Sequence, residues 1–169
     1  GFIEAPGFSR LVAGASGLQL VADPTQAAVD AVLRTVGAGA RVALVHATAY
    51  TDDRQVMVHL ARALGERGLA TGLLDPTQVL WREGNASSEA SWFRGPIDLL
   101  LRFFPAEWLP NTRGACDWRS FFVGSLTPIS NPGAAILVQS KRFPLVWEDL
   151  AVELPTWRAL LPETRSPRD

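Results

Sequence analysis

Cysteine, lysine and long hydrophobic stretches are scarce in this sequence. Cys116 is the only cysteine among 169 residues, which excludes an internal disulfide and a zinc site built on cysteines. A reducing, cytoplasmic location is therefore expected. No uninterrupted apolar run approaches the roughly 18 residues that a membrane-spanning helix needs, and the N-terminus lacks the charged-then-apolar order of a signal peptide. We expect no membrane partner.

The sequence also lacks an excess of charge of either sign. Sixteen basic and seventeen acidic residues give a net charge of −1, which argues against nucleic acid or an anionic membrane as a partner held mainly by charge. With 47% hydrophobic residues, the chain can bury a core, and its length suits a single domain spanning 1–169. Because the first residue is glycine rather than methionine, we expect a piece of a longer protein.

Familiar catalytic motifs are missing as well. The glycine clusters at 14–17 and 37–39 have neither dinucleotide-binding nor phosphate-loop spacing, and no nucleophile elbow is present. His46 and His59 have no second metal ligand at a suitable spacing, so both are interpreted as structural histidines. Cys116 has no neighbouring base that would activate it. The function must therefore be sought in the arrangement of segments.

Alternating segments in the first two thirds of the chain predict an α/β fold. Asp23 followed by proline predicts the start of a helix that runs to about residue 36. The apolar, β-branched run 41–46 predicts a buried strand, and a helix from Thr51, a strand over 69–74 and a strand over 96–102 follow. Strands and helices joined by short connections imply a Rossmann-like parallel sheet flanked by helices.

The second half has a different composition. All six tryptophans and nine of the twelve prolines lie beyond residue 80, which predicts an aromatic-rich layer of irregular segments packed on the α/β core. Within it, Leu126–Ile129 is expected as a strand, 134–139 as either strand or helix, and the region after Ser140 as a helix. The polar stretch 83–91 and residues 1–20 are expected as loops, with one short element near 18–21.

Two groups of charged residues are candidates for ligand binding. Asp52, Asp53 and Arg54 lie just beyond the carboxyl end of the first predicted strand, where open parallel sheets bind ligands and a helix N-terminus offers free N–H donors. A simple capping turn remains the alternative. Lys141, the only lysine, precedes Arg142, and the two could hold a phosphate as a point charge and a planar fork. A solvated first turn is the alternative there.

The order of several segments resembles the glutathionylspermidine synthase family of ATP-grasp ligases, in the supporting pre-ATP-grasp part. The similarity covers most of the chain and lies in degenerate motifs taken in order. They are Phe2–Pro6, the strand Val42–His46 with the acidic turn Thr51–Asp53, Thr127–Ile129 with the later run Ser140–Trp147, and Leu160–Thr164. Pro6 stands where the family has asparagine, and the chain contains no glycine-rich Lys-Pro lobe.

The resemblance implies a function and assigns residues to it. Lys141 matches the family's lysine that binds ATP phosphates, and Glu4 matches a glutamate that holds magnesium. The chain is then expected to be a supporting, substrate-binding domain of an ATP-dependent carboxylate–amine ligase that needs the remaining ATP-grasp lobes for turnover. Its substrate would be a small molecule or a peptide. By location, Asp52, Asp53 and Arg54 would face that substrate.

A second hypothesis belongs to another class of protein. The chain would be a non-catalytic, Rossmann-like binding or protein-interaction module whose tryptophan- and proline-rich half docks a partner. A contiguous exposed surface would favour it; the tryptophans to inspect are Trp81, Trp92, Trp108 and Trp118.

Overall fold

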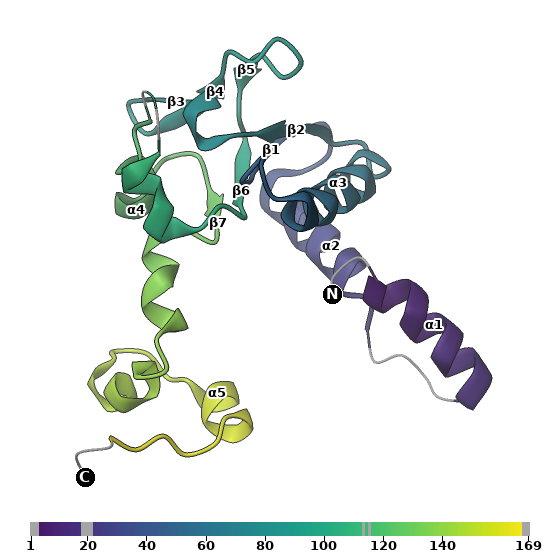
Figure 1. Ribbon diagram of the computed structural model, residues 1–169, viewed down its shortest axis with the longest axis vertical. Helices are drawn as coiled ribbons and strands as arrows, with labels where there is room; N and C mark the ends of the chain where they lie inside the picture. Colours follow the sequence, from purple (N-terminus) through teal and green to yellow (C-terminus); the bar gives the residue numbers. More distant parts are fainter. Residues whose placement is uncertain (1–3, 18–21, 113, 115, 167–169) are drawn as a thin grey trace.

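The computed structural model describes residues 4–17, 22–112, 114 and 116–166. Its centre is a four-stranded parallel sheet with the strand order β2-β1-β6-β7, and helices α2 and α3 pack beside it (Figure 1). The strands are β1 (Arg41–Val45), β2 (Ala70–Leu74), β6 (Leu99–Arg102) and β7 (Ile129–Ser130). The parallel sheet flanked by helices confirms the predicted α/β class and is consistent with a Rossmann-like fold.

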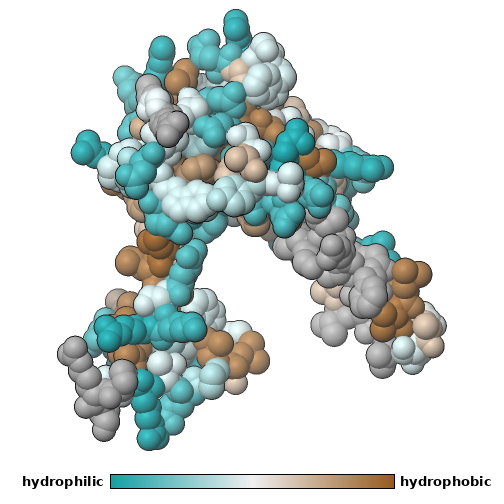
Figure 2. All heavy atoms as spheres, in the orientation of Figure 1, coloured by the Kyte–Doolittle hydropathy of each residue, from teal (hydrophilic) through white to brown (hydrophobic). Residues whose placement is uncertain are grey.

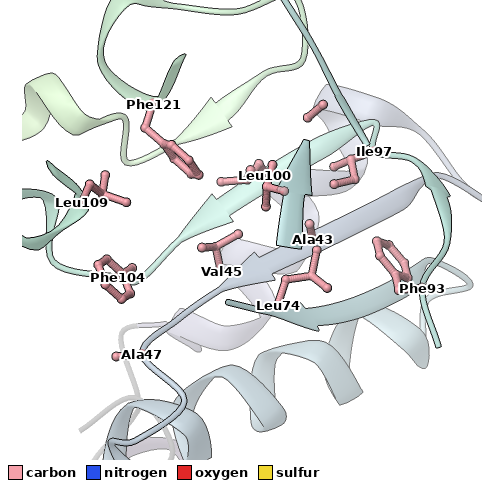
Figure 3. Packing of buried hydrophobic residues seen from close by; sticks show 12 residues of the cluster. Ala43, Val45, Ala47, Leu74, Phe93, Ile97, Leu100, Phe104, Leu109 and Phe121 are labelled. Atoms are coloured by element: carbon pink, nitrogen blue, oxygen red, sulfur yellow. The ribbon is translucent and has the colours of Figure 1, made fainter. Parts of the chain in front are cut away.

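Strand β1 occupies the middle of the sheet because its side chains are apolar on both faces. Its residues 42–45 have no solvent exposure, as expected for a central parallel strand. Val42 and Leu44 pack with α2 (Pro24–Val36) and α3 (Thr51–Gly65). Ala43 and Val45 point to the opposite face, where Figure 3 shows them among aromatic and aliphatic side chains from later segments.

Helix α2 begins where the sequence predicts. The Asp23 side chain accepts hydrogen bonds from the backbone N–H groups of Thr25 and Gln26 at 3.0 and 3.1 Å. The bond from Gln26 is the main cause that lowers the pKa of the Asp23 carboxyl, and Arg10 acts in the same direction. This cap therefore stabilises α2 above the ordinary aspartate pKa and is lost as the pH falls through the lowered value.

Two predicted loops are wrong. The polar stretch 83–91 contains strand β4 (Asn85–Ser88), which pairs antiparallel with β3 (Val79–Arg82) across a two-residue turn and with β5 (Gly95–Pro96). Glu83 and Gly84 have φ angles of 50° and 78°, as a tight hairpin turn requires. In β4 the inward positions are the small Ala86 and Ser88, so its low hydrophobicity concealed the alternation of a strand.

The N-terminal segment, also expected as a loop, contains helix α1 (Glu4–Ser16). Its several small residues suggested irregular structure, but its larger apolar residues recur at helical spacing. The short element expected near 18–21 lies outside the described residues. Across the part of the chain that the structure describes, no helix is both long and apolar enough to cross a bilayer.

The C-terminal half divides into a part on the sheet and a part away from it. Helix η2 (Ala106–Asn111) and helix α4 (Ser120–Val123) bring Leu109 and Phe121 into the core below the hairpin. Helix η3 (Gly133–Gln139) then leads away from the sheet (Figure 1). It resolves the strand-or-helix alternative at 134–139. The predicted strand 126–129 is reduced to the two residues of β7.

The last elements pack mainly on one another. These elements are helix η4 (Phe143–Asp149) and helix α5 (Pro155–Leu160). The ring centroids of Phe143, Trp147 and Trp157 lie 5.7 to 6.4 Å from one another. The expected helix after Ser140 is therefore present as a 3-10 helix that begins at Phe143. Its aromatic residues lie in neither of the two buried clusters on the sheet.

Replacing Gly72 tests the packing on β2. A Cβ added at Gly72 would lie 2.2 Å from the ring of Phe93, so Gly72→Ala should lower the free energy of unfolding by about 1–3 kcal/mol through overpacking. At Gly65, the last residue of α3, an added Cβ meets nothing within 4 Å. Gly65→Ala should therefore leave stability unchanged or raise it by up to about 1 kcal/mol. Urea unfolding of both variants measures the difference, and equal stability would contradict this packing.

Candidate functional site

The carboxyl ends of β1 and β2 lie level with each other. Their register pairs Val45 with Leu74, and the backbone N–H of His46 donates to the carbonyl of Leu74 at 3.0 Å. In the sheet, β2 lies on one side of β1 and β6 lies on the other. Connections that diverge in this way leave the ligand crevice of such sheets between the carboxyl ends of β1 and β6, and β2 borders the same carboxyl edge on the other side of β1.

A hollow of about 570 Å³ lies at this edge, between α3 and β2. Its size suits a small ligand, and most of its side chains carry polar atoms. The lining consists of His46, Thr48, Arg54, Ala61, Thr71, Leu73, Asp75, Thr77, Gln78 and Trp92.

His46 is the buried polar group of this hollow. Its side chain is 1% exposed, and Nδ1 has no hydrogen-bond partner among the described residues. A buried nitrogen without a partner costs roughly 1–3 kcal/mol, and because this atom is covered by protein, a ligand in the hollow would reach it only after a local rearrangement. The prediction that His46 is only structural does not account for this atom. His59 does fit that prediction, because its Nε2 lies 3.0 Å from the Thr25 hydroxyl.

The loop after β2 is held rigid by its own hydrogen bonds. Asp75 Oδ1 accepts from the backbone N–H and the hydroxyl of Thr77 at 3.0 and 2.7 Å, and the Asp75 N–H donates to Gln78 Oε1 at 2.9 Å. This reciprocal capping box fixes the Asp75 carboxylate beside the hollow. A preorganised carboxylate loses little conformational entropy when it binds a ligand.

Arg54 supplies the positive charge of the hollow. It lies in the first turn of α3 and is exposed. Asp52 and Asp53 belong to the same turn, but neither lines the hollow. Their position at the N-terminus of α3 suits the helix dipole. Of the three predicted substrate-binding residues, the structure thus brings only Arg54 to the hollow.

The other predicted site residues lie elsewhere. Lys141 is exposed in the turn between η3 and η4 and lines a separate hollow of about 540 Å³ in the C-terminal part. Glu4 is the first residue of α1, and its side chain lies outside the described part of the structure. Within the described residues, no group of three His, Cys, Asp or Glu side chains could hold a metal ion.

Sequence reasoning missed Asp75, Thr77 and Trp92. The first two follow the second predicted strand, over 69–74, more closely than Arg54 follows the first, over 41–46. That repeated position at the end of a strand was the available signal. Trp92 gave no comparable signal, because its indole reaches the hollow only through the loop after β4. Its Nε1 donates to the carbonyl of Leu73 at 3.4 Å, and the residue is 64% exposed.

Comparison with known proteins identifies no relative. No model of a known protein family matches the chain, and no curated protein matches it. The function is accordingly argued from the geometry and chemistry of the residues, and the family resemblance remains a prediction.

Cys116 is predicted to react slowly. Burial is the main cause that raises the pKa of its thiol, and the nearby charges of Asp75 and Asp117 act in the same direction. Because the thiolate is the reactive form, alkylation by iodoacetamide at pH 7.5 should be several-fold slower in the folded protein than in guanidinium chloride. In the folded protein the alkylation rate should continue to rise with pH above the pH range in which a free cysteine loses its proton. Equal rates in the folded and unfolded states would contradict this environment.

Proposed function

We propose that the chain is the substrate-binding, supporting domain of an ATP-dependent carboxylate–amine ligase, and that the hollow beside α3 receives part of the substrate. The observation that carries the binding role is that Arg54 and the carboxylate loop of Asp75 line one hollow at the carboxyl edge of a parallel sheet, beside the buried His46. The ligase assignment is supported by the ordered sequence resemblance and by nothing else.

The chemistry of the hollow favours a small ligand with an anionic group. The Arg54 guanidinium offers a planar fork for a carboxylate, while Asp52 and Asp53 in the same turn offset the positive potential of the α3 N-terminus. Asp75 provides a negative group across the hollow, and the indole of Trp92 an aromatic surface. A peptide or amino acid derivative that carries both charges would match these groups.

Nucleotide chemistry would need groups beyond those described. In the proposed ligase, Lys141 would hold an ATP phosphate and Glu4 a magnesium ion, and bound ATP would supply the activated phosphoryl group. Lys141 has one exposed ammonium, and Arg165, which lines the same hollow, is already paired with Glu163 at 2.9 Å. These residues do not by themselves form a phosphate cradle, so the remaining lobes of a ligase would have to complete the site.

The binding role is tested at Arg54. Glutathione, the anionic tripeptide suggested by the family's name, is titrated into the protein by calorimetry. Arg54→Ala should weaken its binding at least tenfold, because a charge-assisted contact is lost. Arg62→Ala is the matched control: it removes an exposed arginine of the same helix that pairs with Glu66 and does not line the hollow. Equal affinities of the two variants would contradict a role for Arg54.

The nucleotide role is tested at Lys141. In a complete ligase that contains this domain, Lys141→Ala should lower turnover about tenfold or more, on the scale of one lost contact to a phosphate. The melting temperature of the variant should stay unchanged, since Lys141 is exposed. Lys141→Arg would show whether a compact ammonium is required. Unchanged kinetics in Lys141→Ala would remove the residue from the site.

A protein-interaction module is the second candidate. Eight large hydrophobic side chains between residues 137 and 161 are exposed, more than isolated surface residues would give. The four tryptophans singled out from the sequence do not favour it, because Trp81 and Trp118 pack against the core. If glutathione, spermidine and magnesium-ATP all fail to raise the melting temperature of a complete, folded protein, this second candidate is preferred.

A further inference from the structure

Helix α1 is amphipathic and presents its apolar side to solvent. Helical spacing places Leu11, Val12 and Ala15 on one face. Leu11 is 75% and Val12 40% exposed, and hydrophobic residues are visible on this projecting segment in Figure 2. A helix with an unburied apolar face gains little stability from packing, so this face needs a partner.

The opposite side of α1 is attached to its own chain. Arg10 Nη2 lies 2.7 Å from Asp23 Oδ2 at the start of α2, and Ala13, which shares this side by helical spacing, is half-buried. The attachment thus holds the helix away from the sheet (Figure 1) with Leu11 and Val12 turned outward.

An apolar groove on the body of the molecule is also without a partner. It has a volume of about 340 Å³ and lies between α2, α3 and the adjoining face of β6. Apolar side chains provide most of its walls, among them Ala31, Val32, Val56, Met57, Leu99 and Leu101. A helix is expected at this position, because α2 and α3 cover β1 and β2 on this face, while Leu101 of β6 remains half-buried.

We propose that α1 of one molecule lies in this groove of a second copy, and that the exchange is reciprocal. Each molecule carries both the projecting apolar helix and the apolar groove, so two copies related by a twofold axis satisfy both at once. A membrane surface is a poorer partner for α1, because the helix carries only Glu4 and Arg10 as charged residues and lacks the basic face that anionic lipids attract.

The expected contact area is sufficient for a weak dimer. A helix of 13 residues is about 20 Å long and about 10 Å wide, so roughly half of its ~600 Å² of lateral surface can enter a groove. Two helices and two grooves would together bury on the order of 1,200 Å², the lower limit for a specific interface. The dimer should therefore depend on protein concentration.

Disulfide trapping tests the exchange directly. In a Cys116→Ser background, protein with Leu11→Cys is mixed with protein with Ala31→Cys and oxidised. The exchange predicts a covalent heterodimer, since cysteines cross-link only when their Cα atoms come within about 7 Å. In the control, Gln26→Cys replaces Ala31→Cys; Gln26 is exposed on the side of α2 away from the groove, and this variant should trap at least tenfold less. Equal trapping by both partners would overturn the proposal.

A variant that carries both Leu11→Cys and Ala31→Cys distinguishes α1 bound in the groove of a second copy from α1 folded back into the groove of its own molecule. Cross-linked dimers in dilute solution support the exchange. A cross-linked monomer would show α1 in its own groove and would overturn it.

Analytical ultracentrifugation provides the second measurement. The unmodified protein should change from monomer to dimer as its concentration rises through the micromolar range. Leu11→Lys with Val12→Lys should raise the dissociation constant at least tenfold, whereas Gln26→Lys with Gln55→Lys, at two exposed positions that do not line the groove, should change it less than twofold. Circular dichroism verifies that each variant is folded. A protein that stays monomeric at all concentrations, or a dimer that the double variant leaves intact, would overturn the proposal.

Discussion

Burial of β1 on both of its faces is the constraint on which the rest of the structure depends. Four consecutive residues without solvent exposure require apolar layers above and below the sheet, and β1 must have a parallel neighbour on each side to satisfy its backbone groups. Helices α2 and α3 supply one layer, and the hairpin with η2 and α4 supplies the other. Strand β1 ends at Val45, and α3 begins only at Thr51. The hollow lined by His46 lies beside this connection.

The sequence predicts well wherever local chemistry and tertiary packing agree. Asp23 with the following proline fixes the start of α2, and the run at 41–45 is apolar enough to be buried in any context. Prediction is poorer where neighbours far along the chain decide the outcome. The polar strand β4 is stabilised by Thr127, whose hydroxyl accepts from the Ala86 N–H at 2.9 Å. No pattern within residues 85–88 reveals that contact.

The same distinction applies to the site. Arg54 was predicted because a helix N-terminus after a strand is visible in the sequence, and it does line the hollow. Trp92 and His46 complete that hollow through long-range packing, which spacing alone does not encode. Lys141 was singled out for its rarity, and rarity carries no information about position. The structure places it in a different hollow from Arg54.

The loop that carries Trp92 and Phe93 covers one face of the outer strand β2 and reaches its free edge. Phe93 lies over Gly72 on one face, and the Trp92 indole occupies the Leu73 carbonyl, a group that points away from β1 because the alternate residues of β2 make the bonds to that strand. An uncapped edge of this kind invites strands from other molecules to add on. The Trp92 indole therefore engages one edge acceptor of β2 that a strand from another molecule would otherwise use.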